Sequence, residues 1–583
     1  MRLFVLFCGC LGLLTMSSLM KTPGYTPGVQ AAVDHFKTEA INFAASCTRL
    51  KQAARSGNPQ AARLALIECR CRYKQIEAFL EYFFRSSATI YNRAPKFEAE
   101  EGGMEYQSPI GMQVIESMLF DPRTDQRALL EQVDAVESAA LDLPALLYGL
   151  HADDRQVLES LRIELIRIMA LDITGYEAPL LKSGIRESEV ALNAFGQLLQ
   201  PYLRDDTRSD SIRLYLKNAL DLLGEPGSNG KVLNLPESKR FDDFDRLAFL
   251  RLAMLPLQRQ LRLLIRERGL ELNTSKTLNY SANDLFSADA LLPERFPGGD
   301  SGSMIAIGKQ LFNDKRLSGN RQKSCASCHD PEKGFTDRLP VSIGFDGHQR
   351  LDRNAPTLLY SAYQFDQFWD GRAGSLQQQI RTVLRDAREM HADTIKESDV
   401  LAIAAYVRSL HPFNSPFDHY IRRDYDRLSA AARKGANLFM GKAQCATCHF
   451  IPLFNGLIPP DYTLTEFEVL GTTSSDAFAV GGKRLRLSAD QGRYKQYPFD
   501  FFKGAFKTPT VRDAELSYPY MHNGAFHSLE TVMDFYNKGG GAGLGLSVPD
   551  QTLSSSELRL SAEEKKDIIL FIHTLTDSLH SGS

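Results

Sequence analysis

The sequence is poor in cysteine, in net charge and in long apolar runs, and each shortage excludes a class of protein. Nine cysteines among 583 residues are too few for a scaffold held together by disulfides. A formal net charge of −3 offers no electrostatic basis for nucleic-acid binding, so we expect no nucleic-acid partner. Beyond the amino terminus, no apolar run is long enough to cross a bilayer. The length itself exceeds what one hydrophobic core serves, which predicts several domains.

The amino terminus has the pattern of an export signal. Arg2 is followed by an apolar run that ends near Met16, before Lys21 and Pro23. No Ala-x-Ala cleavage site is present, so residues 1–22 are predicted to be an export signal that is cleaved, lipidated or retained as a membrane anchor. Export would place the protein in the periplasm or on the outer face of a bacterial membrane.

The long segment that follows has the periodicity of helices. Apolar residues recur at spacings of three and four, as at Leu158, Leu161 and Leu165, and no strand alternation is visible. The fold class predicted is therefore mainly α, with a helix bundle at residues 30–285. Residues 286–303 concentrate proline, glycine and serine, which predicts a linker.

One part of this bundle resembles the imelysin-like family of exported helical proteins, whose hallmark is Gly-x-His-x-x-Glu. Gly111 and Glu116 match that motif, whereas Gln113 stands where the family has histidine. Glutamine is a far poorer ligand for transition metals than imidazole. The metal site suggested for that family is therefore doubtful here, and the other interpretation is that Gln113 and Glu116 are polar groups packed within the bundle.

Two short runs in the second half of the chain have the same spacing. Residues 325–329 and 445–449 each read Cys-x-x-Cys-His, which is the attachment sequence of a covalently bound c-type haem. The two thiols bond to the haem vinyl groups, and the histidine binds the iron. We therefore predict two haem c groups. The residues that would hold them are Cys325, Cys328 and His329 for the first, and Cys445, Cys448 and His449 for the second.

Three cysteines lie outside both the haem runs and the amino-terminal apolar run. They are Cys47, Cys69 and Cys71. An odd number in an exported protein allows at most one disulfide and leaves one thiol free.

The surroundings of the two haem runs are duplicated. Residues 308–312 and 435–439 match each other before the runs, and the sequence after each run again forms matching blocks followed by a closing helix. Helix, haem run, loop and closing helix are the outline of a small cytochrome c. The pattern predicts a first such domain at residues 304–428 and a second at 429–578.

The two copies differ at the position of a sixth iron ligand. When the blocks are aligned, Phe368 of the first copy faces Met521 of the second. Methionine opposite histidine closes an iron and raises its potential, whereas phenylalanine binds no iron. The second haem is thus predicted to be an electron relay held by His449 and Met521, and the first to have an open face. Tyr520 and His522 are adjacent alternatives to Met521.

Residues 304–577 resemble the bacterial di-haem cytochrome c peroxidase family, which includes the methylamine-utilisation enzyme. The resemblance implies reduction of hydrogen peroxide to water, with electrons from a small cytochrome c or a copper protein. It implies that Glu389 is the acid–base group and that Trp369, the only tryptophan, passes electrons between the haems. It also implies a calcium ion at Asn354 and is compatible with a homodimer. The matching runs are 317–320, 324–329, 334–337, 353–358, 368–373, 389–390 and 518–524.

The sequence departs from that family in the loop before Asn354. Well-studied members carry a histidine there that caps the first iron in the resting state, whereas here His348 has a different spacing. His348 is therefore either a shifted cap that is released on reduction or a histidine of a surface loop. We expect the second case, in which the first iron is always open.

Two other functions stay open on the sequence. One is a di-haem oxidase that modifies a protein substrate held by the helical half, which a tyrosine in place of Met521 would favour. The other is a non-enzymatic electron-transfer protein whose bundle binds iron or a partner. Glu389 and Phe368 argue against it, because an electron carrier needs neither an acid–base group nor an open iron.

Overall fold

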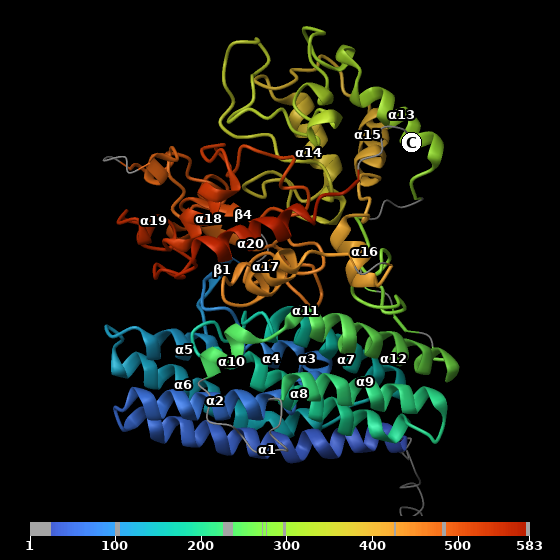
Figure 1. Cartoon of the computed structure of the whole chain (residues 1–583), viewed down its shortest axis with the longest axis vertical. Coiled ribbons are helices and arrows are strands. Elements are labelled where there is room, and N and C mark those ends of the chain that lie inside the picture. The colour runs from blue at the N-terminus through green and yellow to red at the C-terminus, as the bar shows by residue number, and fades with distance from the viewer. Residues whose placement is uncertain are drawn as a thin grey trace, which may run out of the picture.

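The computed structural model describes residues 25–99, 105–224, 237–270, 272–273, 275, 277–294, 299–424, 427–480 and 485–578. The export signal predicted at 1–22 lies outside these residues. The described chain forms a broad helical bundle with two smaller domains stacked on one side of it (Figure 1), and the prediction of a mainly α fold is confirmed.

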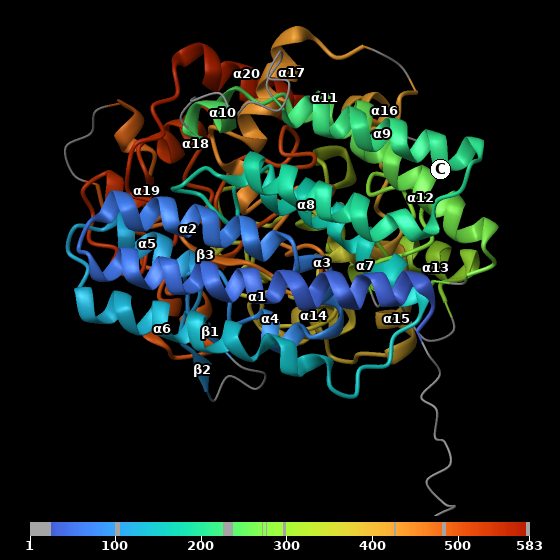
Figure 2. The same cartoon turned by 90° about the horizontal axis from the view of Figure 1, so that it is seen from below.

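The bundle is built from helices that cross it lengthwise. Their bounds are α1 (Pro27–Arg55), α2 (Pro59–Lys74), α3 (Glu77–Phe83), α4 (Arg85–Ala88), α5 (Met112–Phe120), α6 (Gln126–Asp142), α7 (Asp154–Arg167), α8 (Gly184–Leu199), α9 (Thr207–Leu223), α10 (Glu237–Asp243), α11 (Arg246–Phe249) and α12 (Leu255–Glu267). Helix α1 begins at Thr26, whose hydroxyl accepts the backbone N–H of Val29. It packs between α2 and α6 on the face of the bundle farthest from the other domains (Figure 2).

Irregular segments interrupt the bundle where the periodicity predicts only helix. Two wide π-helical turns, at Ile168–Asp172 and Leu250–Met254, follow α7 and precede α12. Pro256 lies at the start of α12, directly after the π-helical turn Leu250–Met254. A small antiparallel hairpin, β1 (Glu98–Ala99) and β2 (Tyr106–Gln107), was not expected. Strands of two residues are too short to leave an alternating pattern in the sequence.

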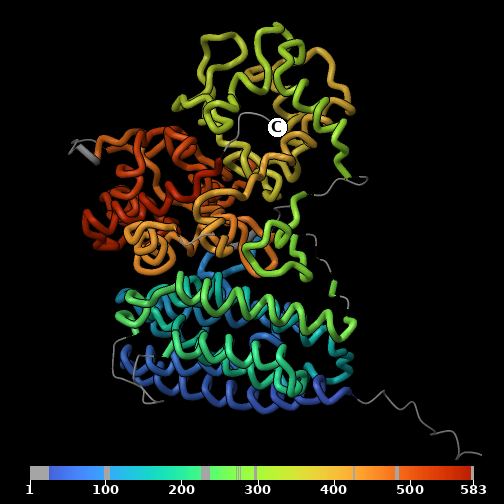
Figure 3. Tube along the Cα trace, turned by 45° about the vertical axis from the view of Figure 1, so that its right-hand side comes forward, coloured from blue at the N-terminus to red at the C-terminus, as the bar shows by residue number. Residues whose placement is uncertain are grey.

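The two upper domains repeat one arrangement. The first contains α13 (Gly302–Phe312), α14 (Leu376–Arg385), α15 (Glu397–Arg408) and α16 (Pro416–Arg422). The second contains α17 (Ala430–Met440), the strands β3 (Phe467–Val469) and β4 (Ala505–Lys507), and α18 (Leu529–Asn537), α19 (Gly540–Gly543) and α20 (Ala562–His573). Helices α17 and α20 lie close to the bundle, and α13, α14 and α15 lie farther away (Figure 1). The tube in Figure 3 shows the same separation from another side.

A glycine at the same place allows the helix crossing in each copy. A Cβ on Gly308 of α13 would lie 1.9 Å from the carbonyl oxygen of Ala402 in α15. A Cβ on Gly435 of α17 would lie 1.9 Å from the carbonyl oxygen of Asp567 in α20. Any side chain at either position would therefore push the two helices apart. The shared glycine explains why the block before each haem run is repeated in the sequence.

Hydrogen bonds join the bundle to the second haem domain. The side chain of Asn437 in α17 accepts the backbone N–H of Leu247 at 2.9 Å and donates to Asp245 at 2.9 Å. The amide of Gln444, just before the second haem run, donates to the carbonyl oxygen of Pro179 at 2.9 Å. These bonds hold the second haem run against the bundle.

Candidate functional site

Both Cys-x-x-Cys-His runs fold into the same single turn. Each begins with a short 3₁₀ segment, Cys325–Ser327 or Cys445–Thr447. The histidine N–H then donates back to the first cysteine's carbonyl oxygen, at 2.9 Å in both runs. This turn brings both thiols and the imidazole of one run together, and all four thiols are free of disulfides.

The two histidines are oriented by backbone carbonyl groups. Nδ1 of His329 lies 3.0 Å from the carbonyl oxygen of Phe335, and Nδ1 of His449 lies 3.0 Å from that of Pro509. A carbonyl oxygen only accepts hydrogen bonds, so Nδ1 carries the proton and Nε2 keeps its lone pair. Burial lowers the pKa of His449 to about 4 and lowers that of His329 as well. Both imidazoles are thus neutral at pH 7 with Nε2 free to bind iron, which fits the haem ligand that the runs predict.

The loops that carry Phe368 and Met521 have the same backbone conformation. Both residues have a positive φ, 66° and 71°, which is unusual for a side chain of that size. In both loops the residue before donates its N–H to the carbonyl oxygen six residues on, Gln367 to Ala373 at 2.7 Å and Tyr520 to Phe526 at 2.8 Å. The structure thereby confirms the alignment that places phenylalanine in one copy and methionine in the other.

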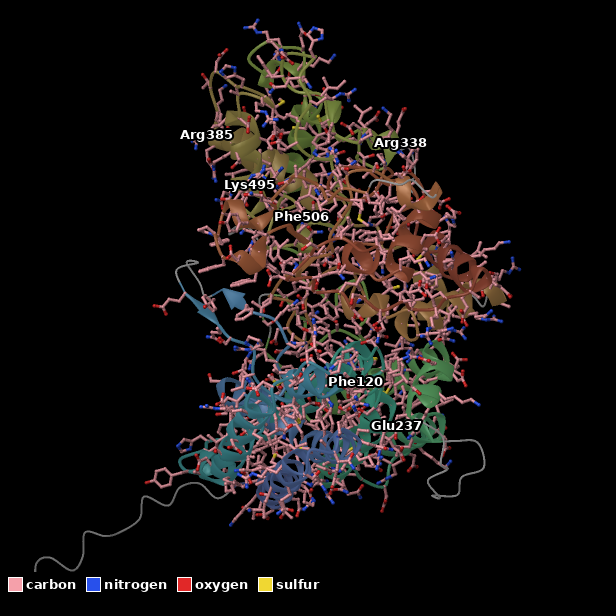
Figure 4. The ribbon with its side chains drawn as sticks, turned by 90° about the vertical axis from the view of Figure 1, so that its left-hand side faces the viewer. Phe120, Glu237, Arg338, Arg385, Lys495 and Phe506 are labelled. Carbon is pink, nitrogen blue, oxygen red and sulfur yellow. The ribbon has the colours of Figure 1, made fainter. Side chains whose placement is uncertain are left out.

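The two neighbours of Met521 are engaged elsewhere. The hydroxyl of Tyr520 donates to the carbonyl oxygen of Ala514 at 3.1 Å. Nε2 of His522 lies 2.9 Å from the hydroxyl of Ser488, and its ring stacks on Phe506 with centroids 3.7 Å apart. Phe506, labelled in Figure 4, lies at the level where the two haem domains meet. Met521 is the member of this trio with no such bond, so we keep it as the predicted iron ligand.

Glu389 is half-buried in the loop that follows α14. Burial raises its pKa to about 7, the charge of Asp386 adds to this, and the cations Arg372, Arg388 and Lys323 oppose it. Glu389 also acts on the first haem run. Burial raises the pKa of Cys328 to about 11, and the negative charge of Glu389 contributes to that rise. A carboxyl group that titrates near pH 7 beside the first haem run suits an acid–base role.

Trp369 joins the two haem domains. Its indole N–H donates to the carbonyl oxygen of Asn354 at 3.0 Å, and its own carbonyl oxygen accepts the N–H of Lys507 in β4 at 2.8 Å. The backbone N–H of Asn354 donates to the carbonyl oxygen of His522 at 2.8 Å. The side-chain nitrogen of Asn354 donates to Leu339 at 3.0 Å. Trp369 and Asn354 thus lie where the two haem domains meet; electron passage through Trp369 and a calcium ion at Asn354 stay predictions.

His348 lies on the surface. It is exposed in a tight turn in which a carboxylate oxygen of Asp346 accepts the backbone N–H groups of His348 and Gln349, at 2.9 and 2.7 Å. The exposed position favours the interpretation of His348 as a histidine of a surface loop. Neither this role nor that of an iron cap is tested, and both stay predictions.

Arg372 is a site residue to which the sequence analysis gave no role. Its guanidinium lies 3.5 Å from the centroid of the Phe368 ring and pairs with Asp370 at 2.9 Å. The residue stands in the matching run 368–373, so a signal was present. The direction of its side chain was not visible, because it depends on the left-handed turn at Phe368.

The imelysin-like motif lies inside the bundle, where protein groups bond to one oxygen of Glu116 and leave its other oxygen buried without a hydrogen-bond partner. One oxygen of Glu116 accepts the backbone N–H groups of Leu180 and Leu181, both at 2.7 Å, and the amide nitrogen of Gln113 lies 3.4 Å from Asn92. Burial raises the pKa of Glu116 to about 7. These contacts are those of packed polar groups.

A lysine occupies the place in the bundle where carboxylates converge. Glu77, Asp172 and Glu177 form a buried group whose oxygens lie within 4.8 Å of one another, a spacing that could hold a metal ion. The ammonium of Lys74 lies 2.8 Å from Glu77, 2.8 Å from Asp172 and 2.5 Å from Glu177. Lys74 therefore supplies a cation to all three carboxylates, and Arg167 pairs with Glu77 at 3.0 Å and with Glu177 at 2.7 Å. This group could not be predicted from the sequence, because its members come from separate elements.

Two of the three remaining cysteines face each other. The sulfur atoms of Cys47 in α1 and Cys69 in α2 lie 3.4 Å apart and are buried, without a disulfide bond. Cys71 is half-buried and separate from them. Any single disulfide that this chain forms is therefore expected between Cys47 and Cys69.

Comparisons with known proteins agree with this geometry. The family model of the di-haem cytochrome c peroxidase matches residues 302–401. Cytochrome-c peroxidase IdrP2 of Denitromonas iodatirespirans is 32% identical over 322 residues, which cover 49% of this chain and 84% of that protein. Methylamine utilization protein MauG of Methylorubrum extorquens is 30% identical over 315 residues, covering 49% and 80%. Cytochrome c551 peroxidase of Pseudomonas aeruginosa is 27% identical over 298 residues, covering 46% and 78%.

Solved structures give a looser match. The crystal structure of a MauG-like protein associated with microbial copper homeostasis is 27% identical, with a TM-score of 0.42, and covers 49% of this chain and 93% of its own. No helix among the described residues is both long and apolar enough to span a membrane.

The relatives cover the half that holds both haem runs, and the family carries two covalently bound haem c groups, as predicted. Through this half, the chain belongs to the di-haem cytochrome c peroxidase family.

Proposed function

We propose that this protein is an exported peroxidase that reduces hydrogen peroxide to water with electrons from a small cytochrome c or copper protein. The observation that carries the proposal is that two loops with the same backbone conformation carry different residues at one position. Met521 stands in the loop of the second domain where a sixth iron ligand is needed, and Phe368 stands at the same place in the first. Haem iron, when bound, supplies electron storage in the second domain and peroxide binding and cleavage in the first.

The chain's own groups then handle the proton. The carboxylate of Glu389 takes a proton from one oxygen of hydrogen peroxide and delivers it to the other, which leaves as water. A pKa of about 7 suits both halves of that transfer, because the group is neither strongly acidic nor permanently protonated. The ring of Phe368 cannot bind iron, so it would not compete with peroxide for the metal.

Trp369 is the residue that we assign to electron passage between the two domains. Its indole bonds to the first domain through Asn354, and its backbone bonds to the second through Lys507. The bonds fix the ring at the junction. A protein-modifying oxidase is the second candidate, because one relative is the methylamine utilization protein MauG. Met521 argues against it, since a tyrosine as sixth ligand, in place of this methionine, would favour that activity.

Replacement of Glu389 by glutamine tests the proposal. The amide keeps the shape of the side chain but neither accepts nor returns the proton, so peroxide turnover should fall by about 10²–10⁴-fold. A pyridine haemochrome assay should still count two haems per chain. Glu397→Gln is the matched control, because Glu397 is an exposed carboxylate of the same domain that pairs with Arg381. Undiminished turnover in Glu389→Gln would refute the proposed mechanism.

A further inference from the structure

Two acidic side chains of the second haem domain are buried beside its haem run. Glu466 and Glu468, on either side of Phe467 at the start of β3, are 2% and 8% exposed. A carboxylate oxygen of Glu468 lies 3.6 Å from the sulfur of Cys448, the atom that would bond to the haem. Carboxylates removed from water in this way need a partner cation, because burial of an unpaired charge is costly.

The partner comes from the helical bundle. The ammonium of Lys96 pairs with Glu466 and lies 3.4 Å from an oxygen of Glu468. The hydroxyl of Tyr176, also from the bundle, donates to Glu466 at 3.1 Å. The ring of Tyr176 meets that of Phe450, the residue after His449, edge to face with centroids 5.1 Å apart. Two bundle residues therefore complete the surroundings of the second haem run.

Charges at this position act directly on a haem. A carboxylate close to an iron stabilises its oxidised, more positive state and lowers the reduction potential, and a nearby cation does the opposite. Both effects are strong where water is excluded, as it is from Glu466. The net charge that the second haem experiences is thus set by the balance of Lys96 against Glu466 and Glu468.

We propose that the helical bundle is an electrostatic cap on the second haem, in which Lys96 offsets Glu466 and Glu468 and thereby raises that haem's reduction potential. Tyr176 is a positioning residue that fixes Glu466 by its hydrogen bond. The inference deepens the proposed function, since a relay haem must be reduced readily by its electron donor. It gives the bundle a task that the match to the peroxidase family, which covers only the other half of the chain, leaves unexplained.

A redox titration of the full-length protein with both haems bound tests the cap. Spectroelectrochemistry resolves one midpoint potential for each haem. Lys96→Gln should shift the second haem's midpoint downward and leave the first unchanged. Glu468→Gln should shift it upward, and the double variant should return towards the wild-type value. The opposite signs exclude a merely structural effect, because disruption of the interface would move both single variants in the same direction.

Lys51→Gln is the matched control. Lys51 of α1 also bridges two carboxylates, Asp134 at 2.9 Å and Glu137 at 2.6 Å, but α1 lies on the face of the bundle away from the haem domains (Figure 1). The cap is refuted if Lys96→Gln leaves the second midpoint where Lys51→Gln leaves it, or if Lys96→Gln and Glu468→Gln shift it alike. Peroxide turnover is measured separately, so shifts of the expected signs without turnover would uphold the cap and refute the peroxidase.

Discussion

The guanidinium of Arg372 lies against the ring of Phe368, 3.5 Å from its centroid, and so brings a positive charge to the residue that replaces an iron ligand. Burial raises the pKa of Glu389 to about 7, and Arg372 is the first of three cations that hold it from rising further. The side chain that we propose leaves the first iron open and the carboxyl group to which we assign proton transfer are therefore linked through one arginine.

The pH dependence of turnover should report this link. Glu389 must be ionised to accept the first proton, so the wild-type rate should fall below pH 7, by about tenfold per pH unit. Arg372→Gln removes a cation that lowers the pKa, so the pKa of Glu389 rises and the acid limb moves to higher pH. The measurement is kcat/KM for peroxide against pH. Arg381→Gln, which removes an exposed arginine of the same domain, should leave the profile unmoved. An acid limb that stays in place in Arg372→Gln would contradict the link.

A methionine in place of Phe368 should give the first iron the coordination predicted for the second. Phe368→Met places a thioether in a loop whose backbone already matches that of Met521. The first iron should then become six-coordinate and low-spin, with nearly complete loss of peroxide turnover. Electron paramagnetic resonance and visible spectra of the oxidised and half-reduced protein measure the change. Phe368→Leu, which offers no ligand, should keep the open iron. A high-spin first haem in Phe368→Met would show that this loop does not face the iron.

The sequence was sufficient for those parts of the site that depend on contiguous motifs. The spacing within residues 325–329 and 445–449 sets a single turn, so both haem runs could be predicted without the fold. The equivalence of Phe368 and Met521 could be predicted for the same reason, because each lies three residues before a glycine with a positive φ. Local spacing determines local geometry in all these cases.

Charge pairs across the fold were beyond reach. Lys74 pairs with Asp172, 98 residues away, and Lys96 lies beside Glu468, 372 residues away. A lysine in a helix is ordinarily a solvated residue, and no local pattern distinguishes one that will be buried. Only the packing of α2 against the π-helical turn Ile168–Asp172, and of the bundle against the second haem domain, creates these sites. The small hairpin β1–β2 could not be predicted, because its strands are too short to show a periodicity in the sequence.

The facing thiols should form the single disulfide of the exported protein. Sulfur atoms 3.4 Å apart need only a small movement to reach the bond length of about 2.05 Å. The hydrogen bond between them, together with burial, raises the pKa of Cys47, so the reactive thiolate is suppressed once the bundle has packed. We therefore expect the bond to form during folding and to stabilise the bundle by about 3 kcal/mol. Alkylation of the denatured protein after export, followed by mass analysis, should find that of Cys47, Cys69 and Cys71 only Cys71 is modified. Alkylation of all three cysteines would contradict this.

The ammonium of Lys74 should be indispensable to the bundle. It lies among Glu77, Asp172 and Glu177, all fully buried, so Lys74→Met leaves three buried carboxylates with one fewer cation. Removal of one partner from a buried ion pair typically costs about 3–5 kcal/mol, and the bundle should unfold at a markedly lower temperature. Thermal unfolding followed by far-ultraviolet circular dichroism measures the change. Lys217→Met is the control, because Lys217 is 71% exposed and pairs only with Asp221. If Lys74→Met unfolded at the wild-type temperature, protons would have to neutralise the three carboxylates. The ammonium of Lys74 would then not be needed for stability.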